Sequence, residues 1–226
     1  MKAFDSFANI FDNGGSLNIR DSWEITENGD EAQLKKLRIT FKDGVFITIE
    51  NGTYKGLFAS LKHYSSFLDD DDCDGIAFLE KDGKKYVIFT ELKSKVDSDV
   101  TKKAFEQILL SFLKFHMLLS VCKGYDVNQY EFVGVIACGL KAYQDITKIK
   151  DELLLKQLQN KKLSHKDRFF YKILCNNVNI KFADAHMFKY KEFSDDILNK
   201  SLKICFYHTE PKGSELNIDI SEIINE

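Results

Sequence analysis

Two apolar runs around one short turn constrain the fold of this chain more than any other feature. Residues 75–79 and 85–93 flank the turn signal Asp82-Gly83. β-Prone runs joined by Asp-Gly favour a hairpin. Residues two apart on a strand share a face, so we expect Glu91 and Lys93 to project together, with Leu92 on the other side. The pattern predicts a strand that ends with a carboxylate beside an ammonium group.

A second carboxylate is expected close to this pair. Asp74 precedes the first strand of the hairpin, immediately before Gly75. Asp74 and Glu91 are each roughly eight residues from the turn, so a regular register brings them to the same open end. The sequence therefore predicts two carboxylates and one lysine at one edge of a sheet.

Such a trio suits metal-assisted hydrolysis. Mg²⁺ prefers oxygen ligands and keeps several waters, and it activates a bound water as a Lewis acid. A neighbouring lysine orients or deprotonates the attacking water, or stabilises the charge that develops on a phosphate. The alternative is that Glu91 and Lys93 form an ordinary exposed ion pair, which contributes little. These three residues alone leave both interpretations open.

Asp74, the stretch GIAFLEKDGKKYVIFT and then Glu91-Leu92-Lys93 resemble the PD-(D/E)xK nuclease superfamily, which has the restriction-endonuclease-like fold. That family places an Asp at the start of one core strand and ExK or DxK on the next. A helix follows and in several branches carries a glutamine; here KKAFEQILLSFLKF contains Gln107. The resemblance covers mainly residues 73–122, and strand 131–138 is consistent with the next core element.

The resemblance implies a role for each matching residue. Asp74, Glu91 and the Leu92 carbonyl would be ligands of Mg²⁺ or Mn²⁺, Lys93 the catalytic lysine, and Gln107 a support for the site or the nucleic acid. Two positions depart from the family pattern. Cys73 stands where a proline is often found, and the helix expected at 54–68 has no glutamate, so that only Glu50 just before it is available for a second metal site.

The remaining pattern predicts a mixed-sheet α/β or α+β domain. We expect a first hairpin from the runs 37–41 and 45–49, a helix at 99–122 capped by Ser98 or Asp99, and a buried strand at 131–138. The other expected elements are a helix at 144–163, strands at 169–174, 178–182 and 202–207, and a weak alternation at 216–220. One domain is expected over 1–226, with a β-rich part at 1–53, the nuclease-like core at 54–140, and a helix and strands at 141–226 completing the sheet.

Composition limits the function classes. The chain has 226 residues, 44% hydrophobic and 30% charged, with a net charge of −3, which gives no support to a strongly basic nucleic-acid binder. Its five dispersed cysteines form no CxxC pair, so a zinc site is not expected. Without a visible secretory signal or membrane-length apolar run, the cysteines are interpreted as reduced, mostly buried thiols of a cytoplasmic protein.

Three polar clusters have two interpretations each. Gln107 and Lys103 either reach the site or belong to a solvated helix face. Four consecutive aspartates, Asp69 to Asp72, are interpreted as a solvated acidic loop, with a metal or a basic partner as the alternative. The strongest basic cluster, in 156–172, is interpreted as a phosphate contact rather than a solvated helix end; its members are Lys156, Lys161, Lys162, Lys166, Arg168 and Lys172. The aromatic run Phe169 to Tyr171 is expected in the core more than against bases.

The sequence thus predicts a metal-dependent nuclease. It would hydrolyse phosphodiester bonds, of DNA more than RNA because the resembled family acts mostly on DNA. The near-neutral charge suggests that activity or targeting depends on a homodimer or a partner subunit. A role in restriction or defence against foreign DNA rests on the family alone. The alternative is a non-catalytic nucleic-acid-binding or scaffold subunit that keeps the fold.

Overall fold

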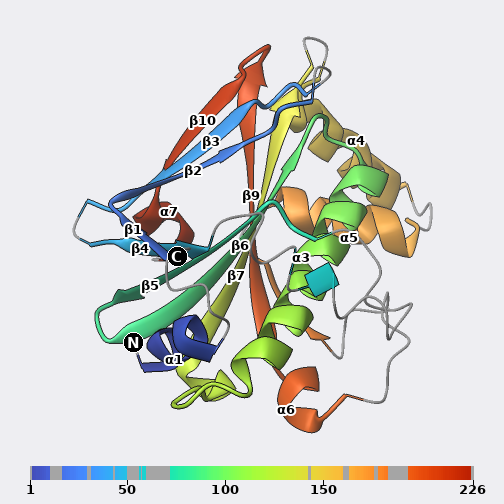
Figure 1. Cartoon of the computed structure of the whole chain (residues 1–226). Helices are drawn as coiled ribbons and strands as arrows, with labels where there is room; N and C mark the ends of the chain where they lie inside the picture. Colours follow the sequence, from blue (N-terminus) through green and yellow to red (C-terminus); the bar gives the residue numbers. More distant parts are fainter. Residues whose placement is uncertain are drawn as a thin grey trace.

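The computed structural model describes residues 2–10, 17–29, 32–42, 44–49, 56, 58–59, 72–141, 144–159, 163–175, 178–182 and 193–224. Within them the chain builds an α/β structure, a large mixed sheet flanked by helices (Figure 1). The elements in chain order are α1 (Lys2–Ile10), β1 (Leu17–Arg20), β2 (Ser22–Thr26), β3 (Lys36–Thr40), β4 (Phe46–Ile49), β5 (Gly75–Lys81), β6 (Lys84–Lys93), α3 (Ser98–Leu119), η2 (Val127–Gln129), β7 (Tyr130–Leu140), α4 (Ile146–Leu158), α5 (His165–Leu174), β8 (Val178–Lys181), α6 (Asp195–Leu198), β9 (Ser201–Pro211), β10 (Glu215–Asp219) and α7 (Ile220–Ile224).

The described strands of the large sheet number seven, in the order β1-β4-β5-β6-β7-β9-β8. Strands β4, β5 and β6 are antiparallel neighbours, whereas β6, β7 and β9 run parallel. A parallel connection needs a crossover, and α3 supplies it between β6 and β7. The carboxyl ends of β6 and β7 therefore lie side by side, with Lys93 opposite Cys138.

A smaller sheet of three described strands, β10-β3-β2, covers one side of the large one (Figure 1). The expected hairpin between 37–41 and 45–49 is wrong, although both strands form. β3 pairs with β2 in the small sheet, and β4 pairs with β1 in the large sheet. Strands β1 and β2 are separated only at Asp21, whose carbonyl accepts from the Phe41 amide at 2.8 Å. The β1–β4 pair of the large sheet thus continues into the β2–β3 pair of the small sheet. Local alternation of apolar residues predicts the strands but not which distant strand each one pairs with.

The large sheet is apolar on both faces. On β6, Val87 and Phe89 join the core under α3, whereas Ile88 and Leu92 join the core between the two sheets. This alternation follows the two-residue period of a strand. Helix α3 begins after Asp97, whose side chain accepts from the Val100 amide at 2.8 Å, so the expected cap at Ser98 or Asp99 is wrong by one or two positions.

Several other expectations have clear outcomes. Strand 169–174 is wrong, because this segment belongs to α5, where Phe170, Ile173 and Leu174 are buried at helical spacing. The strands at 131–138, 178–182 and 202–207 and the helix at 144–163 are confirmed with shifted ends by β7, β8, β9 and α4, and the weak alternation at 216–220 falls mostly on β10. The helix expected at 54–68 lies almost wholly outside the described residues.

Among the helices that the structure describes, none combines the length and the apolar character needed to cross a membrane.

Candidate functional site

The β5–β6 hairpin forms as its sequence predicts. Lys81 pairs with Lys84 across the turn, and the two turn residues Asp82 and Gly83 have φ of 52° and 76°. Positive φ at both central residues is the requirement of a tight two-residue hairpin turn, and Asp and Gly tolerate it. The register then runs without a slip to Gly75 opposite Thr90. Asp74 and Glu91 are therefore brought to the same open end of the hairpin.

Asp74 ends the antiparallel ladder with its own side chain. Its amide donates to the Thr90 carbonyl at 2.8 Å, and its Oδ2 accepts from the Leu92 amide at 2.8 Å. The carboxylate therefore takes the place of the main-chain acceptor that β5 would supply if it continued. The N–H and C=O of one strand residue point to the same side, so the Leu92 carbonyl is directed toward the Asp74 end as well.

Gly75 must be a glycine for steric reasons. A Cβ at this position would lie 2.5 Å from Trp23 Cζ2 of the small sheet and 2.7 Å from Thr90 Oγ1. The close approach of Trp23 fixes the start of β5 from the side opposite α3. Asp74 therefore adjoins a backbone position, Gly75, that packs closely against Trp23 and Thr90.

Glu91 and Lys93 project together from β6 with Leu92 on the other side, as expected, and the shared face is the one toward α3, while Leu92 packs between the sheets. Lys93 Nζ contacts Glu91 Oε1 and donates to Gln107 Oε1 of α3 at 2.7 Å. The Glu91 side chain is 2% exposed and that of Lys93 17%. The predicted residues Asp74, Glu91, Lys93 and Gln107 are therefore gathered at the carboxyl end of β6, the first two across the hairpin and the last two through a hydrogen bond.

Two thiols border this group. Burial raises the pKa of Cys138, opposite Lys93, to about 12, against the opposing effect of the Lys93 charge. Burial likewise raises the pKa of Cys73 well above its ordinary value, although a hydrogen bond with Ser111 lowers it. Both thiols are therefore protonated near neutral pH.

The donor atoms fit a hard divalent cation. The described residues contain no group of three or more His, Cys, Asp or Glu side chains placed to hold a metal ion. Mg²⁺, however, is commonly bound through one or two carboxylates while it keeps several waters. Asp74 and Glu91 with the Leu92 carbonyl would make an all-oxygen set of that kind, whereas the buried protonated thiols beside them do not suit it.

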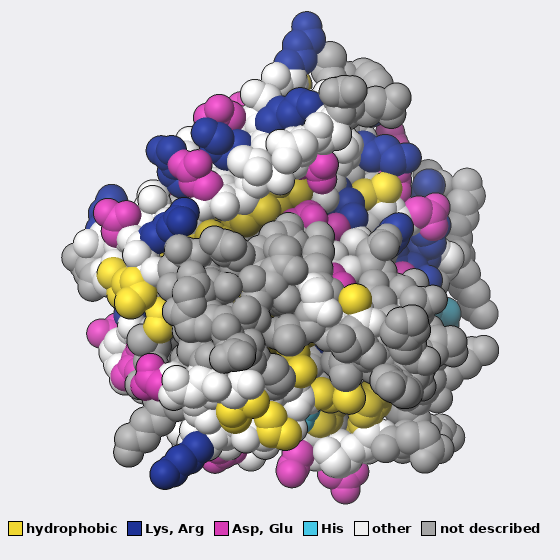
Figure 2. All heavy atoms as spheres, viewed as in Figure 1, with side chains coloured by type: hydrophobic (Ala, Val, Ile, Leu, Met, Phe, Trp, Pro, Cys, Tyr) yellow, Lys and Arg dark blue, Asp and Glu magenta, His cyan; other side chains and the backbone are white. Residues whose placement is uncertain are grey.

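The structure describes only some of the basic residues that were predicted to contact nucleic acid. Lys103 is exposed on α3, and Lys166 and Arg168 lie on α5, which packs on α3 through Phe105 and Phe169 with ring centroids 4.9 Å apart. Lys166 pairs with Asp99, and Arg168 Nε donates to the Leu163 carbonyl at 3.2 Å. Lys161 and Lys162 lie outside the described residues. Figure 2 shows basic and acidic side chains interspersed over the small sheet, in the upper left of the view.

The interpretation of the aspartate run as a solvated loop is wrong at Asp72. The Asp72 side chain is 4% exposed and pairs with Lys114 of α3, which is 0% exposed. Ser111 Oγ, also on α3, accepts from the Cys73 amide at 2.9 Å. Sequence reasoning missed Ser111 and Lys114 as partners; the available signal was a lysine on the apolar stripe of a buried helix. Asp69 to Asp71 lie outside the described residues.

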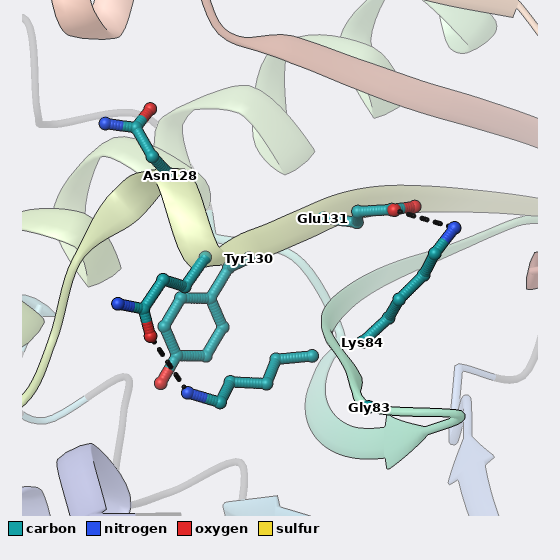
Figure 3. A pocket seen from close by; sticks show the side chains of 7 residues that line it. Gly83, Lys84, Asn128, Tyr130 and Glu131 are labelled. Carbon is teal, nitrogen blue, oxygen red and sulfur yellow. Dashed lines mark hydrogen bonds and ion pairs between the residues drawn. The ribbon is translucent and has the colours of Figure 1, made fainter.

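A separate hollow of about 370 Å³ lies at the opposite end of β6 (Figure 3). Its lining includes Lys84, which points at Glu131 and pairs with it at 3.5 Å, and Tyr130. Lys85 donates to Gln129 Oε1 at 3.1 Å. These polar groups satisfy one another at an exposed edge, far along the strand from Glu91, so the hollow is not part of the candidate site.

No protein-family model matches the chain, and a search of curated proteins and of solved structures finds no match to it.

Proposed function

We propose that this protein is a metal-dependent nuclease with a restriction-endonuclease-like core, which hydrolyses phosphodiester bonds with Mg²⁺ or Mn²⁺. The observation that supports it most is the placement of Lys93, which contacts Glu91 and donates a hydrogen bond to Gln107. The residue before it, Leu92, donates its amide hydrogen bond to Asp74. The carboxyl ends of parallel strands are also where open α/β sheets generally bind ligands.

Each residue has a distinct role in this proposal. Asp74, Glu91 and the Leu92 carbonyl would hold the cation. When bound, the cation would supply Lewis-acid activation of a water and of a phosphate oxygen. Lys93 orients or deprotonates the attacking water, and Gln107 fixes the position of the Lys93 ammonium by accepting its hydrogen bond. The Glu91 carboxylate also contacts the Lys93 ammonium and helps to hold it in place.

We infer a nucleic-acid substrate, DNA more than RNA, because the resembled family acts mostly on DNA. Lys103, Lys166 and Arg168 are the proposed phosphate contacts, with Lys161 and Lys162 from the sequence. The net charge of −3 suggests help from a second copy or a partner subunit. None of the five cysteines forms a disulfide, which suits the reducing cytoplasm, and restriction or defence against foreign DNA is the proposed role.

A non-catalytic subunit with the same fold is the second candidate. The observation in its favour is the burial of two candidate site residues, since Glu91 is 2% exposed and Gln107 is 6% exposed. A buried Glu–Lys–Gln network also occurs as a structural feature with no catalytic role.

The test is cleavage of labelled double-stranded DNA, single-stranded DNA and RNA with Mg²⁺ or Mn²⁺. Wild type is compared with Lys93→Ala and with Lys84→Ala, a control at the exposed start of the same strand. Cutting that requires metal, disappears in Lys93→Ala and persists in Lys84→Ala supports the nuclease and identifies its substrate. No cutting by folded wild type supports the binding subunit, and equal cutting by all three points to a contaminant or another site.

A further inference from the structure

Helix α3 carries a polar stripe within its buried surface. Gln107, Ser111 and Lys114 are spaced four and three residues apart, so they lie on one side of the helix, and all three are buried. Their neighbours on the helix are apolar, including Ile108, Phe112 and Phe115. Buried polar side chains of this kind require partners, because an unmet one is unfavourable.

The partners of the stripe are the two residues that precede Asp74. Gln107 Nε2 lies 3.5 Å from the Asp72 carbonyl, and Lys114 pairs with the Asp72 carboxylate. Ser111 Oγ accepts from the Cys73 amide at 2.9 Å. The Lys114 ammonium also lies 5.6 Å from the centre of the Phe58 ring, a cation–π distance. Main chain and side chain of residues 72–73 are therefore both attached to α3.

Gln107 joins this attachment to the proposed site. The same side chain accepts from Lys93 through Oε1 and approaches Asp72 through Nε2. One helix face thus fixes the lysine at the end of β6 and the chain that leads into Asp74 at the start of β5. The Asp72–Lys114 ion pair and the hydrogen bond from the Cys73 amide to Ser111 are buried, so solvent screens them only weakly.

We propose that the α3 stripe of Gln107, Ser111 and Lys114 positions the Asp74 carboxylate against the Leu92 amide, so that Ser111 and Lys114 are positioning residues of the candidate metal site. Their effect passes through Asp72 and Cys73. The role in metal binding rests on the proposed function, whereas the effect on Asp74 is open to measurement without metal.

The direct readout is hydrogen exchange of the Leu92 amide, which donates to Asp74 Oδ2. Exchange at Leu92 is divided by exchange at Phe89 in the same strand, so that the ratio reports opening that is local to Leu92. We expect this ratio to rise about tenfold in Ser111→Ala and in Lys114→Met, since each loses a buried attachment. Ser111→Ala keeps the ion pair and is the variant to rely on if Lys114→Met does not fold. Leu119→Ala, a buried change on α3 outside the stripe, should leave the ratio unchanged.

Mn²⁺ binding, followed by electron paramagnetic resonance on the same proteins, provides the second readout. Weaker Mn²⁺ binding in Ser111→Ala, with no further effect of that change in an Asp74→Asn background, supports the proposal. An unchanged Leu92 ratio in the folded variants overturns it, even if wild type binds Mn²⁺ and cuts DNA. A raised ratio in a protein that neither binds Mn²⁺ nor cuts nucleic acid overturns the metal-site role and the proposed function together.

Discussion

Lys93 at the end of β6 donates to Gln107 of α3 at 2.7 Å while it also contacts Glu91 on its own strand. One ammonium therefore joins a strand and a helix and balances a carboxylate that is almost completely buried. Such a group is either a well-placed catalytic lysine or a structural ion pair. The two roles separate when stability and activity are measured on the same variants.

Stability should depend on the balance of charge at this pair. Lys93→Met removes the ammonium group that contacts the buried Glu91 carboxylate, and we expect the free energy of unfolding to fall by about 3 kcal/mol. Glu91→Gln combined with Lys93→Met removes both charges and should recover at least about 1 kcal/mol of that loss. Urea unfolding of wild type, both single variants and the double variant gives the coupling energy. Equal losses in the Lys93 single and double variants would contradict a charge-paired Glu91.

Activity should depend on the charge of Asp74 more than stability does. Asn retains an oxygen that can accept from the Leu92 amide, so we expect Asp74→Asn to lose about 1 kcal/mol of stability. Loss of the charge should lower metal-dependent cleavage about 100-fold, the scale of removing one charged group that stabilises a transition state.

The matched control for Asp74→Asn is Asp82→Asn on the same hairpin. Asp82 has φ of 52°, a conformation that Asn accepts, so the hairpin should form unchanged. Cleavage by this variant should equal that of wild type. A similar loss of cleavage in both variants would show that the hairpin, and not the Asp74 charge, was affected.

The sequence allowed prediction of the parts that local chemistry determines. The Asp82-Gly83 turn fixes the hairpin register, and this register alone brings Asp74 and Glu91 to one end. The helix α3 follows from helical periodicity, whereas the site role expected of Gln107 came from the family resemblance. Contacts between distant segments were beyond reach: Leu37 and Phe46 are both strand residues, but each pairs with a different earlier strand. Phe169 to Tyr171 are β-prone residues that tertiary packing places in α5. The sequence does not distinguish Asp72 from the three aspartates before it. Its pairing with Lys114 depends on the packing of α3 against residue 72, which only the fold shows.

The Asp97 cap should make stability depend on pH. Burial acts to raise the pKa of Asp97, but hydrogen bonds from Lys95 and the Val100 amide outweigh it and bring the pKa below its ordinary value of 3.8. The folded pKa is lower than the unfolded one, so this contribution is fully present above pH 3.8 and is lost as the pH falls through the folded pKa. The stability difference between wild type and Asp97→Asn should therefore shrink as the pH falls below about 4.

Asp97→Ala tests the same cap at neutral pH. It removes the side-chain acceptor of the Val100 amide and should lower the free energy of unfolding by about 1 kcal/mol. Asp99→Ala, at an exposed position two residues further along, should have a smaller effect, measured by thermal unfolding. The opposite order would mean that α3 begins at a different residue.

Thr101 offers a change that should stabilise the protein. Its side chain is fully buried, and within the described part of the structure its Oγ1 has no hydrogen-bond partner. Thr101→Val keeps the branched shape and removes the unmet hydroxyl, so we expect a gain of about 1 kcal/mol. Thermal unfolding measures the gain. A loss of stability would show that the hydroxyl is hydrogen-bonded in solution, to a water or to a residue outside the described ranges.

The basic side chains near α3 are best tested through salt dependence. If Lys103 and Arg168 each neutralise one phosphate, Lys103→Met and Arg168→Met should each reduce the slope of log affinity against log salt by about 0.9 on double-stranded DNA. Lys42→Met is the control, because Lys42 is 82% exposed and pairs with Asp219 next to the small sheet. DNA-binding titrations with Asp74→Asn as the parent protein avoid cleavage during the measurement. Equal slopes for all three variants would assign DNA contact to another surface, whereas a smaller slope for the two test variants alone would place the DNA backbone across α3 and α5.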